Sequence, residues 1–169
     1  MTRTPPTLTG LSTYLLAQTG KRARARLADR LGARGLRLWH LAVLAALDDF
    51  GPQSQRDVGA RFGIHASDVT KVVDELAERD LVSRERDPAD RRRMVLALTA
   101  PGRTLLGGLR QDAAAVQDEV LAALTPEERE VLHGLLLRVH GDLDTADDRG
   151  ALAPGASPRE TEGRPSTGA

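Results

Sequence analysis

Residues 54–78 read SQRDVGARFGIHASDVTKVVDELAE, and the spacing of their apolar residues predicts two short helices joined by a turn. The first helix starts behind a serine that can cap its N-terminus, and it places Val58, Ala60 and Phe62 near one face. Gly63 then ends this helix. The turn at residues 63–66 leads directly into the second helix.

The second helix runs from about Ser67 to Glu78 and carries one apolar stripe. The stripe consists of Val69, Val72, Val73 and Leu76, at the i, i+3, i+4, i+7 spacing of a buried face. The residues that point the other way are Ser67, Lys71, Asp74 and Glu78, flanked by Asp68 and Thr70. Such a polar first half suits the second helix of a helix-turn-helix, which contacts base edges in the major groove of DNA. The candidate DNA contacts are therefore His65, Ser67, Asp68, Thr70 and Lys71.

Residues 81–98 follow as two β-type runs around a polar tip. The runs are LVSRER at 81–86 and MVLAL at 94–98, and the tip, DPADRRR at 87–93, has Pro and Asp at turn positions. Three consecutive arginines cannot be buried cheaply, and an arginine gains most from the focused negative potential of a narrow minor groove. An isolated arginine run is more often a solvated loop. After a helix-turn-helix, we interpret this run as the tip of a DNA-binding wing.

Three short motifs carry a family resemblance: DLV at 80–82, DPADRR at 87–92 and LTAPG at 98–102. With them, the segment from Gln55 to Gly102 resembles the MarR (multiple antibiotic resistance regulator) transcription factors, and the helix order extends the resemblance over residues 8–146. The resemblance implies a mainly α fold with a small β wing, in which terminal dimerisation helices accompany a winged helix-turn-helix. Most members have Gly in place of Asp80, and Asp also tolerates left-handed backbone angles.

The resemblance also implies roles at the wing tip. In the family, an aspartate two residues before a wing-tip arginine holds that arginine for insertion into the minor groove. By position these roles fall to Asp90 and Arg92, with Arg91 and Arg93 as neighbours free to reach phosphates.

The composition limits the remaining possibilities. The 169 residues suit one domain, and the absence of cysteine excludes disulfides, thiolate metal sites and thiol-based redox sensing. No apolar run is long enough to cross a bilayer and the N-terminus lacks a signal peptide, so we expect a cytoplasmic protein without membrane contact. The charges of the 24 basic and 24 acidic residues cancel, so net charge gives no indication of nucleic-acid binding. Only local clusters of basic residues indicate it. Residues 21–37 and the wing are basic, whereas residues 142–148 are acidic.

Four further helices are predicted outside the helix-turn-helix. They span about Leu8–Leu31, Leu36–Asp49, Ala100–Leu124 and Pro126–Asp144. The expected organisation is a flexible tail at 1–7, a MarR-like domain at 8–146 and a disordered tail at 147–169. Within the domain, the winged helix-turn-helix covers about 36–99, and dimerisation helices cover about 8–31 and 100–146.

The last helix is more apolar than one side of a lone surface helix requires. Its large apolar residues are Val131, Leu132, Leu135, Leu136, Val139 and Leu143. With the apolar first helix, it is interpreted as a homodimer interface; the alternative is that these helices complete a monomeric core. A two-fold dimer would read an inverted repeat with half-sites roughly 10 base pairs apart, centre to centre.

No motif of an enzyme, a cofactor site or a phosphate-binding loop is present. His133 and His140 lie seven residues apart on one helical face, but no carboxylate is spaced to complete a metal shell, so neither metal nor cofactor is expected. In resembling proteins, small phenolic or aromatic-acid ligands bind in a crevice between the dimer helices and the winged helix. Tyr14, Trp39 and His40 lie on elements that would line it, and basic residues of the first helix could pair with a ligand carboxylate. Core or interface positions for Tyr14 and Trp39 are the alternative.

These patterns favour a homodimeric, ligand-responsive DNA-binding regulator, with repression as the expected mode. The alternatives are a winged helix for protein contacts or DNA architecture without ligand sensing, and an enzyme. The polar face and the arginine-rich tip argue against a protein-contact module, whose exposed face should be apolar. The lack of a catalytic constellation argues against an enzyme.

Overall fold

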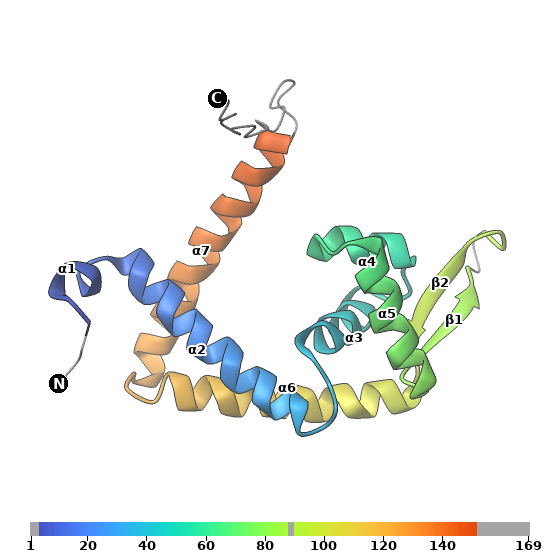
Figure 1. Cartoon of the computed structure of the whole chain (residues 1–169), viewed down its shortest axis with the longest axis horizontal. Helices are drawn as coiled ribbons and strands as arrows, with labels where there is room; N and C mark the ends of the chain where they lie inside the picture. The colour runs from blue at the N-terminus through green and yellow to red at the C-terminus, as the bar shows by residue number, and fades with distance from the viewer. Residues whose placement is uncertain (1–3, 88–89, 152–169) are drawn as a thin grey trace, which may run out of the picture. The chain divides into compact units, whose positions relative to one another are not determined.

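Helices dominate the computed structural model, which describes residues 4–87 and 90–151, with side chains up to residue 143 (Figure 1). The elements are α1 (Pro6–Thr9), α2 (Ser12–Gly32), α3 (Leu38–Phe50), α4 (Gln55–Phe62), α5 (Ala66–Glu78), β1 (Val82–Arg86), β2 (Met94–Leu98), α6 (Ala100–Val120) and α7 (Pro126–Ala151). They form two units, residues 1–122 and 123–169, and α7 belongs to the second. The mainly α class with a small β wing is confirmed.

Several helix bounds differ from the sequence prediction. The first predicted helix is two helices, α1 and α2, because the chain leaves helical geometry at Leu11, which is extended. The helix expected from Leu36 begins only at Leu38, since Leu36 still takes part in ending α2. Finally, α6 ends at Val120 instead of Leu124, and α7 continues to Ala151, past the expected end near Asp144. The predicted tail beyond residue 151 lies outside the described residues.

Three helices end in the same motif, which turns the chain sharply. At the end of α5, the N–H of Leu81 donates to the carbonyl of Leu76 and the N–H of Asp80 donates to that of Ala77. Asp80 occupies the left-handed position of this Schellman motif, with φ +55°, where glycine is usual. Gly35 and Gly63 take the same position after α2 and α4. Asp80 therefore adopts the left-handed geometry that Asp tolerates, and the departure from Gly leaves this turn intact.

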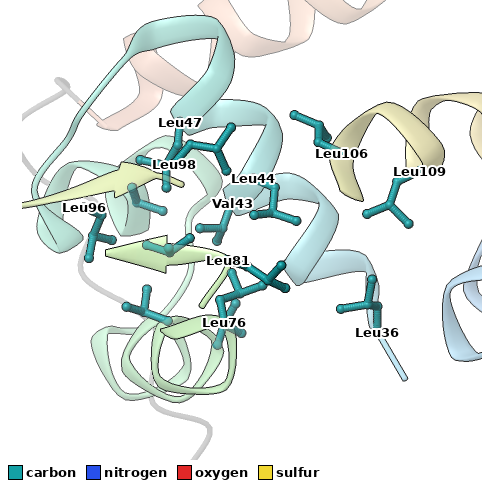
Figure 2. Close-up of a cluster of buried hydrophobic side chains, with 14 of the residues drawn as sticks. Leu36, Val43, Leu44, Leu47, Leu76, Leu81, Leu96, Leu98, Leu106 and Leu109 are labelled. Atoms are coloured by element: carbon teal, nitrogen blue, oxygen red, sulfur yellow. The ribbon is translucent and has the colours of Figure 1, made fainter. Parts of the chain in front are cut away.

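The core of the first unit joins the two predicted helices to the wing and to α6. Figure 2 shows Val43, Leu44 and Leu47 of α3 among side chains from α5, the two strands and α6. The apolar stripe of α5 is buried as predicted, with Val73 and Leu76 fully enclosed. Because this stripe is buried, the opposite side of α5 must face outward.

The contact between α4 and α5 depends on a residue that the sequence pattern did not single out. Val58 is buried as predicted, but Ala60 is exposed, and the second buried residue of α4 is Gly59. A Cβ on Gly59 would lie 3.2 Å from Cγ2 of Val69, so the two helices pack closely here. Val58 and Ala60 therefore do not share one buried face, and α4 packs on α5 over the smaller Gly59.

The wing strands pair in antiparallel register, from Val82 opposite Leu98 to Arg86 opposite Met94. Gln53 adds a bridge to Leu96 through two backbone hydrogen bonds, which fastens the start of the helix-turn-helix to β2. At the other end of β2, α6 begins against the end of α5. There a Cβ on Gly102 would lie 2.1 Å from the carbonyl oxygen of Leu81.

We expect Gly102→Ala to destabilise the fold by about 3 kcal/mol or more, because the backbone of Leu81 cannot yield to the new methyl group. Gly107→Ala, in open space on the same helix, should instead stabilise it by about 0.5–1 kcal/mol. Urea unfolding of both variants at one protein concentration tests the pair. Equal stability of the two variants would contradict this packing of α6 against Leu81.

Candidate functional site

The first half of α5 presents a polar surface. His65, at the N-cap position, and the four other candidates on this helix, Ser67, Asp68, Thr70 and Lys71, are all exposed. The side chains of His65 and Lys71 have no hydrogen-bond or ion-pair partner in the described part of the chain, so both remain available to a ligand. This half of α5 can therefore present donors and a cation to an anionic surface.

Thr70 is less free than its neighbours. Its hydroxyl donates to the carbonyl oxygen of Ala66 at 2.9 Å and accepts from Nε2 of Gln55 at 2.6 Å. Gln55, the first residue of α4, thereby ties the two helices together at the polar surface. Sequence reasoning missed Gln55, because a glutamine directly after the helix cap carries no distinctive signal.

The wing tip is closed by Asp90, though not as the family resemblance implies. Its carboxylate accepts a hydrogen bond from the backbone N–H of Arg92 at 3.0 Å, and its carbonyl accepts one from the N–H of Arg93 at 2.9 Å. Asp90 therefore shapes the turn instead of holding the Arg92 guanidinium. That guanidinium is exposed and has no ion-pair partner among the described residues.

The neighbouring arginines differ in their freedom. Arg93 was expected to be free, but its guanidinium lies 3.5 Å from the carboxylate of Asp57 on α4. Hydrogen bonding to Ser54, helped by the charge of Arg93, lowers the pKa of Asp57 and keeps it ionised. Among the described residues, the guanidinium of Arg91 forms no such contact, while its backbone carbonyl accepts a hydrogen bond from Nη1 of Arg86 at 2.7 Å.

A groove of about 630 Å³ opens between the N-terminus of α4 and the start of β2. Its lining consists of Ser54, Arg56, Asp57, Ala60, Arg93 and Met94. Arg56 is exposed and, within the described residues, unpaired. The groove thus combines two arginines with the partial positive charge of a helix N-terminus, although Asp57 offsets part of that charge. Neither Arg56 nor the groove was predicted from the sequence.

The three predicted ligand residues are not gathered into one site within the chain. Tyr14 is half-buried near the start of α2, roughly 25 Å along that helix from Leu31, which packs in the core. The Trp39 ring packs against that of Phe62 on α4, with 6.2 Å between the centroids. Trp39 therefore serves the contact between α3 and α4, while part of its surface stays exposed.

His40 is buried, and both of its ring nitrogens are already bonded. Nδ1 accepts from the backbone N–H of Arg37 at 3.0 Å, and Nε2 lies 2.8 Å from Oε2 of Glu75 on α5. Since Nδ1 must be unprotonated to accept, Nε2 carries the proton and donates to Glu75. Within the described chain, His40 thus joins the start of α3 to α5, and its place at a ligand site stays a prediction.

The same contacts set the protonation of this pair. Burial lowers the pKa of His40, and the hydrogen bond to Glu75, which raises it, does not compensate. Burial raises the pKa of Glu75, but hydrogen bonds from His40 and Arg37 outweigh that effect and lower it. The folded protein therefore holds a neutral imidazole against an ionised carboxylate.

We predict that the free energy of unfolding falls as the pH drops below about 6.5, the ordinary pKa of histidine. Above that pH His40 is neutral in both states; below it the unfolded chain binds a proton that the folded chain does not. His40→Gln should flatten the dependence between about pH 7 and 5. Urea unfolding across this range, with His65→Gln as the exposed-histidine control, tests the prediction. An unchanged slope in His40→Gln would contradict it.

His133 and His140 lie on α7, and both are exposed. In the described part of the chain, no group of three or more His, Asp or Glu side chains is arranged to hold a metal ion. No described helix combines the length and hydropathy of a membrane span.

The chain is similar in sequence to known transcriptional regulators. The MarR family profile matches residues 34–93. The HTH-type transcriptional regulator MhqR of Bacillus subtilis (strain 168) is 34% identical over 105 residues, which cover 62% of this chain and 72% of MhqR.

Two solved structures extend the match to most of the chain. A probable transcriptional regulator from Pseudomonas aeruginosa aligns with a TM-score of 0.66 and 34% identity, over 78% of this chain and 98% of that protein. BpsR of Bordetella bronchiseptica, whose DNA binding is regulated by 6-hydroxynicotinic acid, aligns with a TM-score of 0.66 and 28% identity, over 81% and 98%.

Proposed function

Because the chain belongs to the MarR family of transcriptional regulators, we propose that it is a homodimeric repressor that binds an inverted repeat in duplex DNA and is released by a small-molecule ligand. The observation that carries the proposal is the pairing of an outward polar face on α5 with an arginine-rich wing tip. The relatives are named as transcriptional regulators, not as enzymes.

On DNA, α5 enters the major groove with its first half toward the bases. Lys71 and Ser67 are exposed on this half, beside His65, Asp68 and Thr70. Arg92 inserts into the adjacent minor groove, where negative potential is concentrated. Arg56 and the N-terminus of α4 contact a phosphate, because unpaired helix N–H groups and a free guanidinium both favour anions.

The dimer uses apolar surface that each unit leaves exposed. In the first unit, Leu8, Leu11, Leu15 and Leu16 of the α1–α2 region are exposed. In the second, α7 exposes Val131, Leu135, Leu136, Leu137, Val139 and Leu143. Apolar residues in contiguous patches of this kind mark association surfaces. A two-fold dimer then reads two half-sites about one helical turn apart.

The ligand is an anionic aromatic compound. Lys21, Arg22, Arg24 and Arg26 are exposed on α2, and no partner for them exists among the described residues. Farther along, Arg30 and Arg34 are paired with Glu119 and Asp112 of α6, so only the earlier part of α2 offers free positive charge. Tyr14, on the same helix, supplies aromatic surface. BpsR, which responds to a hydroxylated aromatic acid, supports this ligand class.

The competing function, a winged helix for protein contacts alone, fits the molecule less well. Such a module should present an apolar face on α5, whereas the first half of α5 presents Ser, Asp, Thr and Lys side chains.

Arg92→Ala should weaken binding to the preferred duplex by about 1–3 kcal/mol without changing the fold, because an exposed wing tip contributes little packing. Arg103→Ala, an exposed arginine on α6, is the matched control. Fluorescence anisotropy at one salt concentration measures both affinities. An affinity for Arg92→Ala equal to that of the control would refute the wing contact, and a parent protein that binds no duplex would refute the function.

Replacing Leu132 and Leu136 with Asp should abolish dimerisation, since burial of two carboxylates in an apolar seam costs several kcal/mol. Sedimentation velocity measures the assembly state, and circular dichroism checks that the chain stays helical. Glu130→Gln, an exposed polar change on the same helix, should leave the dimer intact. A dimer that persists in the double variant would reject α7 as an interface.

A further inference from the structure

Glu75 lies on α5 one turn after Lys71, at the boundary between the buried stripe and the outward face. Its Oε2 atom accepts hydrogen bonds from the Arg37 guanidinium and from Nε2 of His40. Both partners belong to the start of α3. Glu75 is therefore not free to face a ligand, and its side chain instead connects the DNA-facing helix to a neighbouring element.

A second contact repeats this connection at the end of α5. Arg79, four residues after Glu75, donates from Nη1 to the carbonyl of Gly35 at 3.1 Å and from Nη2 to that of Arg34 at 3.3 Å. Residues 34–40 thus contact α5 at two points, Glu75 and Arg79. We refer to the contacts of Glu75 with Arg37 and His40 as the α3–α5 clamp.

The segment that receives α5 is itself held in place. The side chain of Arg34 donates to Asp112 of α6 at 2.7 Å, which fixes the segment to the long helix. His40 also accepts from the N–H of Arg37, which forms one half of a capping box at the start of α3. The segment that carries the clamp is therefore itself bonded to α6 and to the start of α3.

Apolar packing decides which face of α5 is buried, but the hydrophobic effect has no preferred direction and restrains small rotations about the helix axis less sharply than a directional bond does. Hydrogen bonds are directional, and those at Glu75 lie on the edge of the helix where a small rotation would break them. We propose that Glu75, held by Arg37 and His40, is a positioning residue that fixes the rotation of α5 and thereby aligns Lys71 and Ser67 with base edges. This inference rests on the proposed function.

The ion pair between Glu75 and Arg37 contributes little to stability. The side chains of Glu75 and Arg37 are 34% and 51% exposed, and ion pairs with this exposure contribute little to folding free energy. Removal of the Glu75 carboxylate also leaves the buried Nε2–H of His40 without its acceptor, so the melting temperature should fall, and the DNA affinities are compared at a temperature where every variant is folded. Loss of the clamp should reduce discrimination between DNA sequences, since base contacts need accurate geometry and phosphate contacts tolerate a shift.

The test uses the full chain, a duplex that the parent protein selects from random DNA, and a scrambled duplex of equal length. Glu75→Ala should lower affinity for the selected duplex at least about fivefold, the lower end of the loss for one base contact. Affinity for the scrambled duplex should stay constant or rise, because a negative charge has been removed. Glu75→Gln, which can still accept from His40, should recover part of the loss.

Glu78→Gln is the matched control, because it removes the same charge from an exposed position on the same helix. Charge removal by itself strengthens DNA binding, so a loss confined to the Glu75 variants points to alignment. Unchanged discrimination in Glu75→Ala would overturn the inference alone, as would equal losses on both duplexes. A parent protein that binds neither duplex would overturn the proposed function together with the inference.

Discussion

The structure of the first unit depends on the burial of one apolar stripe, Val69, Val72, Val73 and Leu76 of α5, against α3 and the wing. Because this stripe is enclosed, the opposite face of the helix must point to solvent and carry its polar side chains there. The Schellman motif at Asp80 then turns the chain directly into β1, which places the wing beside the same helix. Burial of the α5 stripe thus determines both which face of α5 points outward and where the arginine-rich wing tip lies.

The parts of the fold that could be predicted are those in which local pattern and burial agree. The period of the α5 stripe, the turn residues between the strands and the tolerance of Asp80 for left-handed geometry all act within a few residues, and each is confirmed. The family resemblance depended on the same residues. Helix ends were less accurate, since they are decided by hydrogen bonds such as that from Leu36 to Leu31, which leave no periodic signal.

The contacts missed at the candidate site join distant residues. His40 was expected to line a ligand site, and its nitrogens are bonded to Arg37 and to Glu75, thirty-five positions away. Arg93 was expected to be free and instead approaches Asp57. Periodicity predicts which face a residue occupies, but it does not identify the partner that meets it there. The same limit explains why Gln55 and Arg56 were missed.

A chain with this polar face and this apolar terminal surface should bind DNA as a symmetric dimer. Selection of bound duplexes from a random DNA library by the parent protein, followed by sequencing, tests that claim most directly. We predict enrichment of an inverted repeat whose half-sites are about 10 base pairs apart, centre to centre. Enrichment of a single unrepeated site, or no enrichment over the starting library, would contradict it.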